Sequence, residues 1–507
     1  MTDGPIRSIL IAGGGTAGWM AALYLARRLE RQGVAITLVE SPAIPTVGVG
    51  EATVPGIRDY FRAVGIPDEE VLRATNGTVK LGIEFRDWAG QGSSFFHPFG
   101  LYGSPSRGVA FHHYWLKRRA VGDPTPLAEY SLGTKLALAD RFMPPLEKPP
   151  ADFAVFDWAV HFDAGLYAAM LSRIAQEAGV TRIAATIGSV ARDGETGLLS
   201  AVSLDDGRRL EADLFIDCSG FRSLLLGGAL GTPYVDWTHL LPCDRAIALP
   251  CANRDGFTPY TRSTALPGGW QWRIPLRHRV GNGYVYSSRH VSDDEALATL
   301  RANLEGEALA EPNLLRFATG HRERFWVGNC VALGLSAGFL EPLESTSITL
   351  IQTGVERLVD LFPTRACDPA LADEYNRTTS LEYARIRDFL LLHYWGNRRF
   401  GEPLWDACRA LELPEELAHK IRLFRARGKI VRYSWDTFLD PSWLSMYAGL
   451  GLMPEQYDPL ADYFTDEQLD QALGRMREAI AQAMARSRPH ADYLAALDAP
   501  PAAARAS

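Results

Sequence analysis

Three glycines near the N-terminus, Gly13, Gly15 and Gly18, have the spacing with which a chain can hold the phosphates of a dinucleotide. In such a turn the first glycine bends the chain and the second lets the backbone approach a pyrophosphate. The third lets a helix pack closely on a strand. Glu40 follows Gly18 by 22 residues, where a carboxylate can accept hydrogen bonds from a ribose hydroxyl pair.

The elements that must position these residues form a strand–helix–strand unit over residues 7–40. "SILIAG" is a short buried strand, residues 13–33 are a glycine turn and a helix that Gly33 ends, and "VAITLVE" is a second strand that reaches Glu40. The helix N-terminus offers free N–H groups and a partial positive charge to phosphates. Thr16 and Ala17 lie at that N-terminus and join the predicted cofactor site.

The glycine motif alone does not distinguish FAD from NAD. A flavoprotein with its own NAD(P)H domain usually has two such motifs, and the sequence contains no second one with a strand and an acid. If the chain is a flavoenzyme, its electrons therefore come from another protein.

Composition limits the other classes of function. The chain has 507 residues, enough for two or three domains or one two-lobed enzyme. A net charge of −8 without a basic run argues against a nucleic-acid partner. No signal peptide or membrane-spanning run is present, and the six cysteines lack CxxC spacing. We expect a cytoplasmic protein with reduced thiols and no metal site.

A second feature is the pair Trp270 and Trp272 in "GGWQWRIP". Residues i and i+2 of a strand share one face, so two indoles would cover one patch of a sheet. Taken alone, the pair indicates a buried core strand that Pro275 ends.

Two later stretches resemble the segments that return to the cofactor in large two-domain flavoproteins. The strand in "ADLFIDCSGFRS" ends at Asp217, and "FWVGNCVALGLSAGFLEPLESTSI" contains Gly334 and Leu335 in a Gly/Ala-rich turn. That class usually has Gly-Asp where this chain has Gly328-Asn329. The resemblance implies cofactor contacts at Asp217, Gly334 and Leu335.

Five segments together resemble the flavin-dependent halogenases of the tryptophan-halogenase family. They are "GGGTAGWMAA", "VGVGEATVP", "TVKLGIEFRDW", "WQWRIP" and "GFLEPLESTSI", in the order in which the family has them. The second segment lies against the flavin in the family, which implies that Gly50 and Ala52 bind the cofactor.

The resemblance also implies an α/β fold. We expect an FAD-binding Rossmann-like lobe of the two-domain flavoprotein monooxygenase type over residues 1–360, with inserted substrate and sheet segments. A mainly helical lobe over residues 361–490 would cover the substrate pocket. Residues 491–507 are Ala/Pro-rich and are expected to be a disordered tail.

The family's reaction is an oxidative halogenation. A separate NAD(P)H-dependent reductase supplies reduced FAD, which reacts with oxygen to give a hydroperoxide. Chloride or bromide attacks it, and the resulting hypohalous acid reaches a lysine that halogenates a small aromatic substrate. The expected partners are that reductase and that substrate, with no nucleic acid and no membrane; a homodimer is left open.

The matching catalytic residues are Lys80 and Glu344. An ammonium can polarise hypohalous acid, while a neutral amine can trap it as a haloamine, and burial makes a lysine amine more nucleophilic. Glu344 would polarise the oxidant or take the proton from the arenium intermediate. Glu341 is a competing candidate. The backbone N–H groups of Thr346 and Ser347 match the family's halide site.

The matching substrate residues are His97, Phe99, Trp443 and Ser345. Phe99 and Trp443 would sandwich a flat, electron-rich ring. Trp270 and Trp272 match the family's partition between flavin and substrate. Enzymes that halogenate free tryptophan place a Tyr-Tyr pair and an acid before the second stacking tryptophan, but this chain has Tyr433 alone.

Asp436 and Asp440 are out of register with that acid. An unpaired zwitterion would be strongly disfavoured in such a pocket. We therefore expect an indole-type substrate other than free tryptophan. Two alternatives remain: a flavin-dependent aromatic monooxygenase, and a non-catalytic flavin-binding or light-sensing protein.

Overall fold

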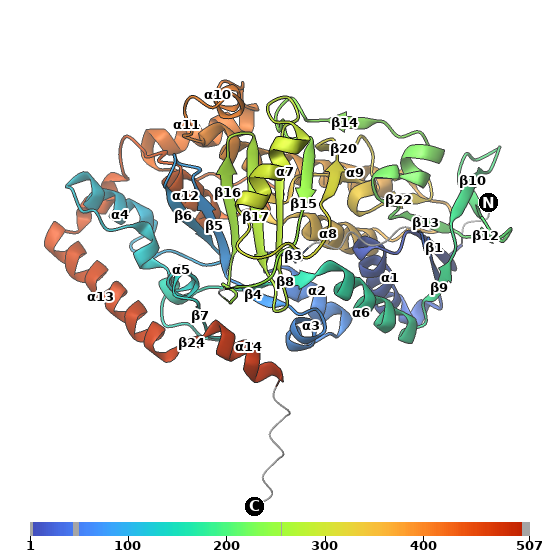
Figure 1. The fold of residues 1–507 in the computed structure, drawn as a ribbon, viewed down its shortest axis with the longest axis horizontal. Coiled ribbons are helices and arrows are strands. Elements are labelled where there is room, and N and C mark those ends of the chain that lie inside the picture. The colour runs from blue at the N-terminus through green and yellow to red at the C-terminus, as the bar shows by residue number, and fades with distance from the viewer. Residues whose placement is uncertain (1–3, 44–49, 255, 499–507) are drawn as a thin grey trace, which may run out of the picture. The chain divides into compact units, whose positions relative to one another are not determined.

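The computed structural model describes residues 4–43, 50–254 and 256–498 (Figure 1). The chain divides into two compact units, each built from three segments. Unit 1 consists of Met1–Gly77, Phe162–Ala246 and Leu314–Arg385, and unit 2 of Thr78–His161, Ile247–Asn313 and Ile386–Ser507. The sequence suggests consecutive lobes, whereas these units alternate along the chain, because later strands return to the sheet that the N-terminus begins.

Unit 1 contains a six-stranded sheet with the order β21-β22-β13-β1-β2-β9. Its strands are β1 (Ser8–Ala12), β2 (Ala35–Glu40), β9 (Thr181–Ala184), β13 (Leu214–Asp217), β21 (Trp326–Val327) and β22 (Cys330–Ala332). All neighbours are parallel except β21 and β22. The register sets Ala12 opposite both Val39 and Asp217, so β1, β2 and β13 end at one edge. In open parallel sheets this edge binds ligands.

Three helices pack around the start of this sheet: α1 (Thr16–Arg28), α6 (Ala164–Glu177) and α8 (Ser347–Asp360). In Figure 1, α1 lies next to both α6 and α8, and it contacts each of these helices as well as β1 and β2. The predicted β1–α1–β2 unit is confirmed. The helix α1 ends at Arg28, and a short 3-10 turn then leads to Gly33, whose backbone adopts the left-handed conformation.

A seven-stranded sheet with the order β19-β15-β18-β17-β16-β5-β6 has most of its strands in unit 2. Its strands are β5 (Gly82–Arg86), β6 (Ser94–Pro98), β15 (Arg245–Ala248), β16 (Thr261–Leu266), β17 (Gly269–Pro275), β18 (Val280–Tyr286) and β19 (Asn313–Arg316). Pro267 and Gly268 form the two-residue turn between β16 and β17. Every residue of β17 is buried, as expected for a central strand.

The tryptophan pair lies on β17 as the sequence predicts, but its rings are not stacked. The ring centroids of Trp270 and Trp272 are 6.3 Å apart and the planes are inclined by 60°. Trp272 stands opposite Gly283 of β18, where an added Cβ would meet the indole at 2.0 Å. The missing side chain of Gly283 therefore gives the tilted ring its space.

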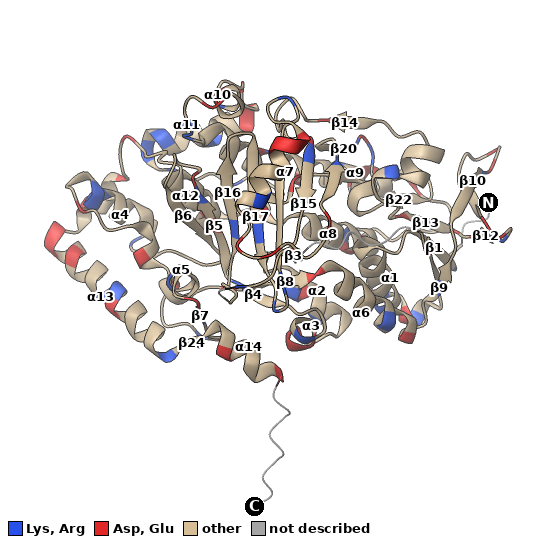
Figure 2. Ribbon diagram, viewed as in Figure 1, with Lys and Arg blue, Asp and Glu red and all other residues tan. Residues whose placement is uncertain are grey.

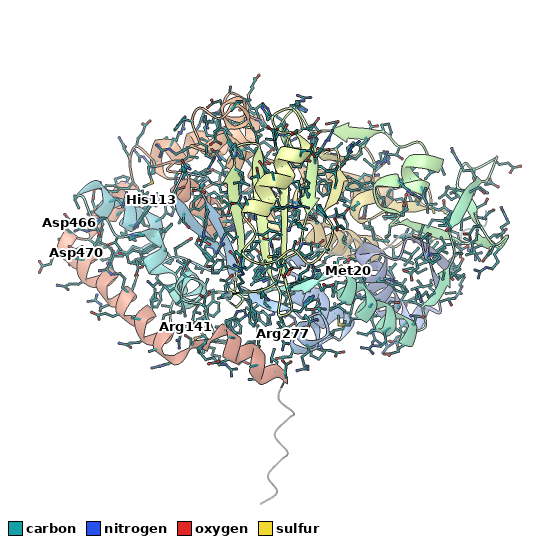
Figure 3. The ribbon with its side chains drawn as sticks, in the orientation of Figure 1. Met20, His113, Arg141, Arg277, Asp466 and Asp470 are labelled. Carbon is teal, nitrogen blue, oxygen red and sulfur yellow. The ribbon has the colours of Figure 1, made fainter. Side chains whose placement is uncertain are left out.

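Most of residues 361–490 is helical, in α9 (Pro369–Gly396), α10 (Pro403–Arg409), α11 (Glu415–Arg427), α12 (Asp440–Gly449) and α13 (Asp466–Arg486), although the division between the two units falls within α9, after Arg385. Within unit 2, α13 is joined to α4 (Phe111–Ala120) by charge. Arg118 of α4 pairs with Asp466 at 3.1 Å and with Asp470 at 2.8 Å. Figure 2 shows acidic residues at this end of α13, and Figure 3 labels both aspartates there.

The expectation of a disordered tail from residue 491 is wrong for residues 491–498. They belong to α14 (His490–Asp498), and residues 499–507 lie outside the described residues. Arg277 pairs with Asp498 at the end of α14, and Arg141 donates a hydrogen bond of 2.7 Å to the Ser487 hydroxyl just before it. Figure 3 labels both arginines beside α14. These long-range contacts order a segment whose composition is typical of a tail.

Within the described part of the chain, no helix is both long and apolar enough to cross a membrane. All six cysteines are buried.

The burial of β17 generates a stability prediction. Trp270→Ala removes a side chain that is only 1% exposed, so the cavity should lower the free energy of unfolding by about 3–5 kcal/mol. Phe400→Ala is the control, because Phe400 is 70% exposed and its loss should cost less than about 1 kcal/mol. Guanidinium unfolding measures both variants. Equal effects of the two substitutions would contradict the assignment of Trp270 to the core.

Candidate active site

The glycine turn in unit 1 has the geometry that a bound dinucleotide requires. Gly13 has a φ of +115°, and a Cβ there would come within 2.3 Å of the Cys218 carbonyl oxygen. A Cβ on Gly18 would come within 1.9 Å of the Gly13 carbonyl oxygen. At Gly15, by contrast, an added Cβ meets open space. Two glycines are thus needed for packing, while the middle one, with Thr16 and Ala17, borders the space that a pyrophosphate would fill.

Glu40 borders an open cavity of about 570 Å³ beside this turn. Its wall comes from Gly14, Trp19 and the α6 residues between Gly165 and Glu177. The Glu40 carboxylate accepts hydrogen bonds from Arg182 and from the Trp19 indole N–H, the latter at 3.4 Å. A paired carboxylate at the end of β2 suits the predicted ribose contact, so these residues fit a dinucleotide cofactor.

The second predicted cofactor segment lies against the helix that follows the glycine turn. Gly334 has a φ of +66°, and a Cβ there would meet the Ala17 side chain at 2.7 Å. Leu335, beside it, is half-buried. Gly50 and Ala52 form the ends of β3 (Gly50–Ala52), and residues 47–49 of their motif lie outside the described residues.

Asp217 lies at the end of a strand, as the sequence predicts, but its carboxylate is bonded to the segment that follows. Its side chain is completely buried at the end of β13. One carboxylate oxygen accepts hydrogen bonds from the backbone and hydroxyl of Ser219, and the other from the backbones of Leu225 and Leu226 at 2.9 and 2.8 Å. We therefore assign the Asp217 carboxylate to holding the loop that follows β13.

The predicted halide segment forms the start of α8. Glu344 ends the 3-10 helix η7 (Pro342–Glu344) and is buried, and Ser345 turns the chain with a φ of +61°. Thr346 is then the N-cap residue and Ser347 the first residue of α8. N–H groups at a helix start have no acceptor within the helix. The buried Thr346 hydroxyl also has no hydrogen-bond partner among the described residues. The N–H groups at the start of α8 and the Thr346 hydroxyl are hydrogen-bond donors of the kind that bind an anion.

Lys80 lies in unit 2, at the end of the short strand β4 (Thr78–Lys80), and has no exposed surface. Its Nζ atom is 5.1 Å from the centroid of the Phe99 ring. A lysine that is completely buried beside an aromatic face is not the solvated surface lysine that is the usual alternative.

The predicted substrate residues of unit 2 lie in one aromatic cluster. His97 is buried between Phe99, at 6.4 Å between ring centroids, and Phe389, at 5.9 Å. Phe389 in turn meets the edge of Trp443 at 5.0 Å and stacks on Phe438 at 3.9 Å. The structure thus joins Lys80, Phe99, His97 and Trp443 through neighbouring rings.

Sequence reasoning missed two members of this cluster, Phe389 and Phe438. Phe389 lies within a helical pattern that predicts α9 but not the direction of its side chains. Phe438 lies between two acids and is half of the stacked pair. Phe438 lies five residues before the predicted substrate residue Trp443, which is a weak signal, whereas nothing near Phe389 in the sequence marks it.

The site residues therefore fall into two groups. Unit 1 contains the glycine turn, Glu40, Gly334 and the start of α8 with Glu344. Unit 2 contains Lys80, the aromatic cluster and the tryptophan pair of β17.

Comparison with known proteins identifies the family. The tryptophan halogenase family model matches residues 8–466. The tryptophan 7-halogenase RebH of Lentzea aerocolonigenes is 35% identical over 516 residues, which cover 94% of this chain and 96% of that protein.

Comparison with solved structures indicates the same family. BrvH, a flavin-dependent halogenase from Brevundimonas sp. BAL3, matches with a TM-score of 0.95 and 51% identity over 97% of this chain and 99% of its own. Xcc4156, a flavin-dependent halogenase from Xanthomonas campestris, matches with a TM-score of 0.94 and 43% identity over 98% and 100%. The chain therefore belongs to the tryptophan halogenase family of flavin-dependent enzymes and has its FAD-binding, Rossmann-like α/β fold.

Proposed function

We propose that this enzyme halogenates an aromatic, indole-type substrate other than free tryptophan, and that Lys80 delivers the halogen. Membership of the family implies FAD, a halide, a separate flavin reductase and an aromatic substrate. When reduced FAD is bound, it supplies hypohalous acid from oxygen and halide. The glycine turn and Glu40 would hold the dinucleotide, and the start of α8 would hold the halide.

Lys80 carries the chemical part of the proposal. Its ammonium would donate a hydrogen bond to the oxygen of hypohalous acid, or its neutral amine would carry the halogen as a haloamine. The halogen then forms a bond to a ring carbon and its bond to oxygen or nitrogen breaks. The ring loses a proton, and the oxygen of the hypohalous acid leaves as water. Glu344 is proposed as the carboxylate that accepts this proton.

The observation that supports a substrate other than free tryptophan is the state of the two acids before Trp443. The Asp436 side chain is buried and accepts hydrogen bonds from Lys420 Nζ at 2.6 Å and from the Tyr433 backbone at 2.7 Å. Asp440 pairs with Arg432. Each acid already has a protein cation as its partner. An amino acid's ammonium would have to displace one of them, at the cost of leaving a charge unpaired.

The first prediction of this proposal concerns Lys80. Lys80→Ala should lower halogenation by about 10²-fold or more, because the group that holds or carries the halogen is lost. FAD binding, followed by flavin absorbance, should not change. Lys117→Ala is the matched control, since Lys117 is a second buried lysine of unit 2, on α4, bonded to the Phe464 carbonyl at 2.8 Å. Product formation by Lys80→Ala at the level of this control would refute the assignment.

The second prediction concerns charge on the substrate. Purified enzyme, FAD, a reductase, NADH and bromide are incubated with indole, tryptamine, indole-3-propionic acid and L-tryptophan. The kcat/KM should be highest for indole and lowest for the zwitterion, because each added charge must be desolvated without a partner.

Mass spectrometry of the products decides two questions in this assay. Equal kcat/KM values for indole and L-tryptophan would overturn the proposed substrate class. A product that gains 16 mass units and no bromine would show a monooxygenase in place of a halogenase.

A further inference from the structure

The strand that carries Lys80 is fixed by side chains rather than by its length. β4 has three residues and pairs antiparallel with β8 (Ala159–Asp163), with Thr78 opposite His161 and Lys80 opposite Ala159. Directly opposed residues share a face of the sheet, as do residues two positions apart. His161 is therefore the diagonal neighbour of Lys80, and the small Ala159 stands across from the lysine.

His161 is the centre of a buried chain of hydrogen bonds. Its Nδ1 atom is 2.8 Å from the Thr78 hydroxyl, and its Nε2 atom is 2.9 Å from the Thr261 hydroxyl. Thr78 in turn donates its hydroxyl hydrogen to the Pro275 carbonyl oxygen at 2.7 Å. The chain thus runs from β16 through His161 to β4 and on to the last residue of β17.

The direction of these bonds follows from a count of hydrogens. A hydroxyl has one hydrogen, and Thr78 uses it toward Pro275, so Thr78 accepts from His161. Nδ1 must then carry the hydrogen of the imidazole, and Nε2 accepts from Thr261. Burial, with the positive charge of Lys80 and smaller effects of His490 and Arg273, holds the pKa of His161 well below its usual range. The imidazole is therefore neutral, with one fixed tautomer.

A second imidazole holds the same strand by its backbone. The Val79 N–H donates to Nε2 of His490 at 3.2 Å, and Nδ1 of His490 is 3.2 Å from the Phe257 carbonyl oxygen. Burial lowers the pKa of His490 to about 4, so this ring is also neutral. His490 begins α14, the helix that the sequence did not predict.

We propose that His161 is a positioning residue for halogen transfer: its neutral imidazole, through Thr78, fixes the strand from which Lys80 presents its amine. This inference rests on the proposed role of Lys80. A diffusing oxidant is used productively only if the amine that receives it is in place, and a displacement of about 1 Å can cost about 10²-fold in rate.

Three substitutions separate the two bonds of the imidazole. In His161→Asn the amide nitrogen takes the place of Nδ1, so the bond to Thr78 is kept. In His161→Gln the amide oxygen takes the place of Nε2, so the bond to Thr261 is kept. His161→Leu removes both. All three are compared with His112→Leu, which removes a buried imidazole of α4 that is bonded to the Gly428 carbonyl.

The readout is the fraction of hypobromous acid that reaches the substrate. Enzyme, FAD, a reductase and bromide turn over indole in the presence of a soluble 1,3-diketone, which is brominated by oxidant that escapes. The ratio of bromoindole to brominated diketone should fall by about 10-fold or more in His161→Leu and His161→Gln, with total oxidant unchanged. His161→Asn should recover most of the ratio, and His112→Leu should keep the wild-type value.

The outcomes distinguish this inference from the proposal on which it rests. If Lys80→Ala keeps the wild-type ratio, the role of Lys80 fails and the inference with it. If Lys80→Ala loses the ratio while His161→Leu keeps it, only the inference fails. Recovery by Gln rather than Asn would also overturn it. If His161→Leu does not fold, the comparison of Asn with Gln decides, because both are polar and similar in volume to histidine.

The tautomer provides a test that requires neither cofactor nor turnover. Spectra of the protein labelled with ¹⁵N-histidine should show His161 with a hydrogen on Nδ1 and none on Nε2 from pH 6 to 9. The signal is assigned by its absence in His161→Asn. A hydrogen on Nε2 in this range would contradict the direction of the hydrogen-bond chain.

Discussion

The constraint on which unit 2 depends is an amine with no contact with water. Lys80 has no exposed surface, and removing a charged amine from water is costly unless its surroundings compensate. Its Nζ atom faces the Phe99 ring, whose π electrons attract a cation. The two imidazoles that hold its strand are kept neutral by burial, and the charge of Lys80 itself contributes to this at His161. The strand thus gains rigid partners without adding a cation beside the lysine.

The same principle shapes the aromatic cluster around Trp443. Lys420 is buried with its Nζ atom 4.1 Å from the Trp443 ring, and its charge is met by Asp436. The cation beside the indole ring and the carboxylate that it pairs with form a neutral group as a whole. What remains around His97, Phe389 and Phe438 is a surface of rings, which suits a flat substrate better than a charged one. Lys80 and the two acids before Trp443 are in this sense opposite cases, because Lys80 is buried beside an aromatic ring whereas Asp436 and Asp440 are each paired with a cation.

The sequence predicts what is local and misses what is distant. The glycine turn is readable because its three glycines are two to five positions apart, and the contacts of Gly13 and Gly18 show a steric reason for two of them. The shared face of Trp270 and Trp272 is equally local, but their 60° inclination is not, because it depends on Gly283 of the next strand. Asp217 can be read from the sequence as the end of a strand, yet the donors that surround its carboxylate come from the segment from Ser219 to Leu226, whose fold no local pattern specifies.

The strand that carries Lys80 shows why the residues around the candidate site are difficult to predict from the sequence. Three residues of β-strand form few backbone hydrogen bonds, too few to offset the entropy of fixing them. The strand is held in place by hydrogen bonds to distant partners. Thr78 bonds to His161 and Pro275, 83 and 197 positions away, and Val79 bonds to His490, 411 positions away. None of the three is marked by spacing from Lys80, and the last precedes a segment whose composition resembles a tail. A residue type and its family motif therefore indicate which lysine is the candidate for the reaction, whereas the residues that hold it in place emerge only when the whole of unit 2 has folded.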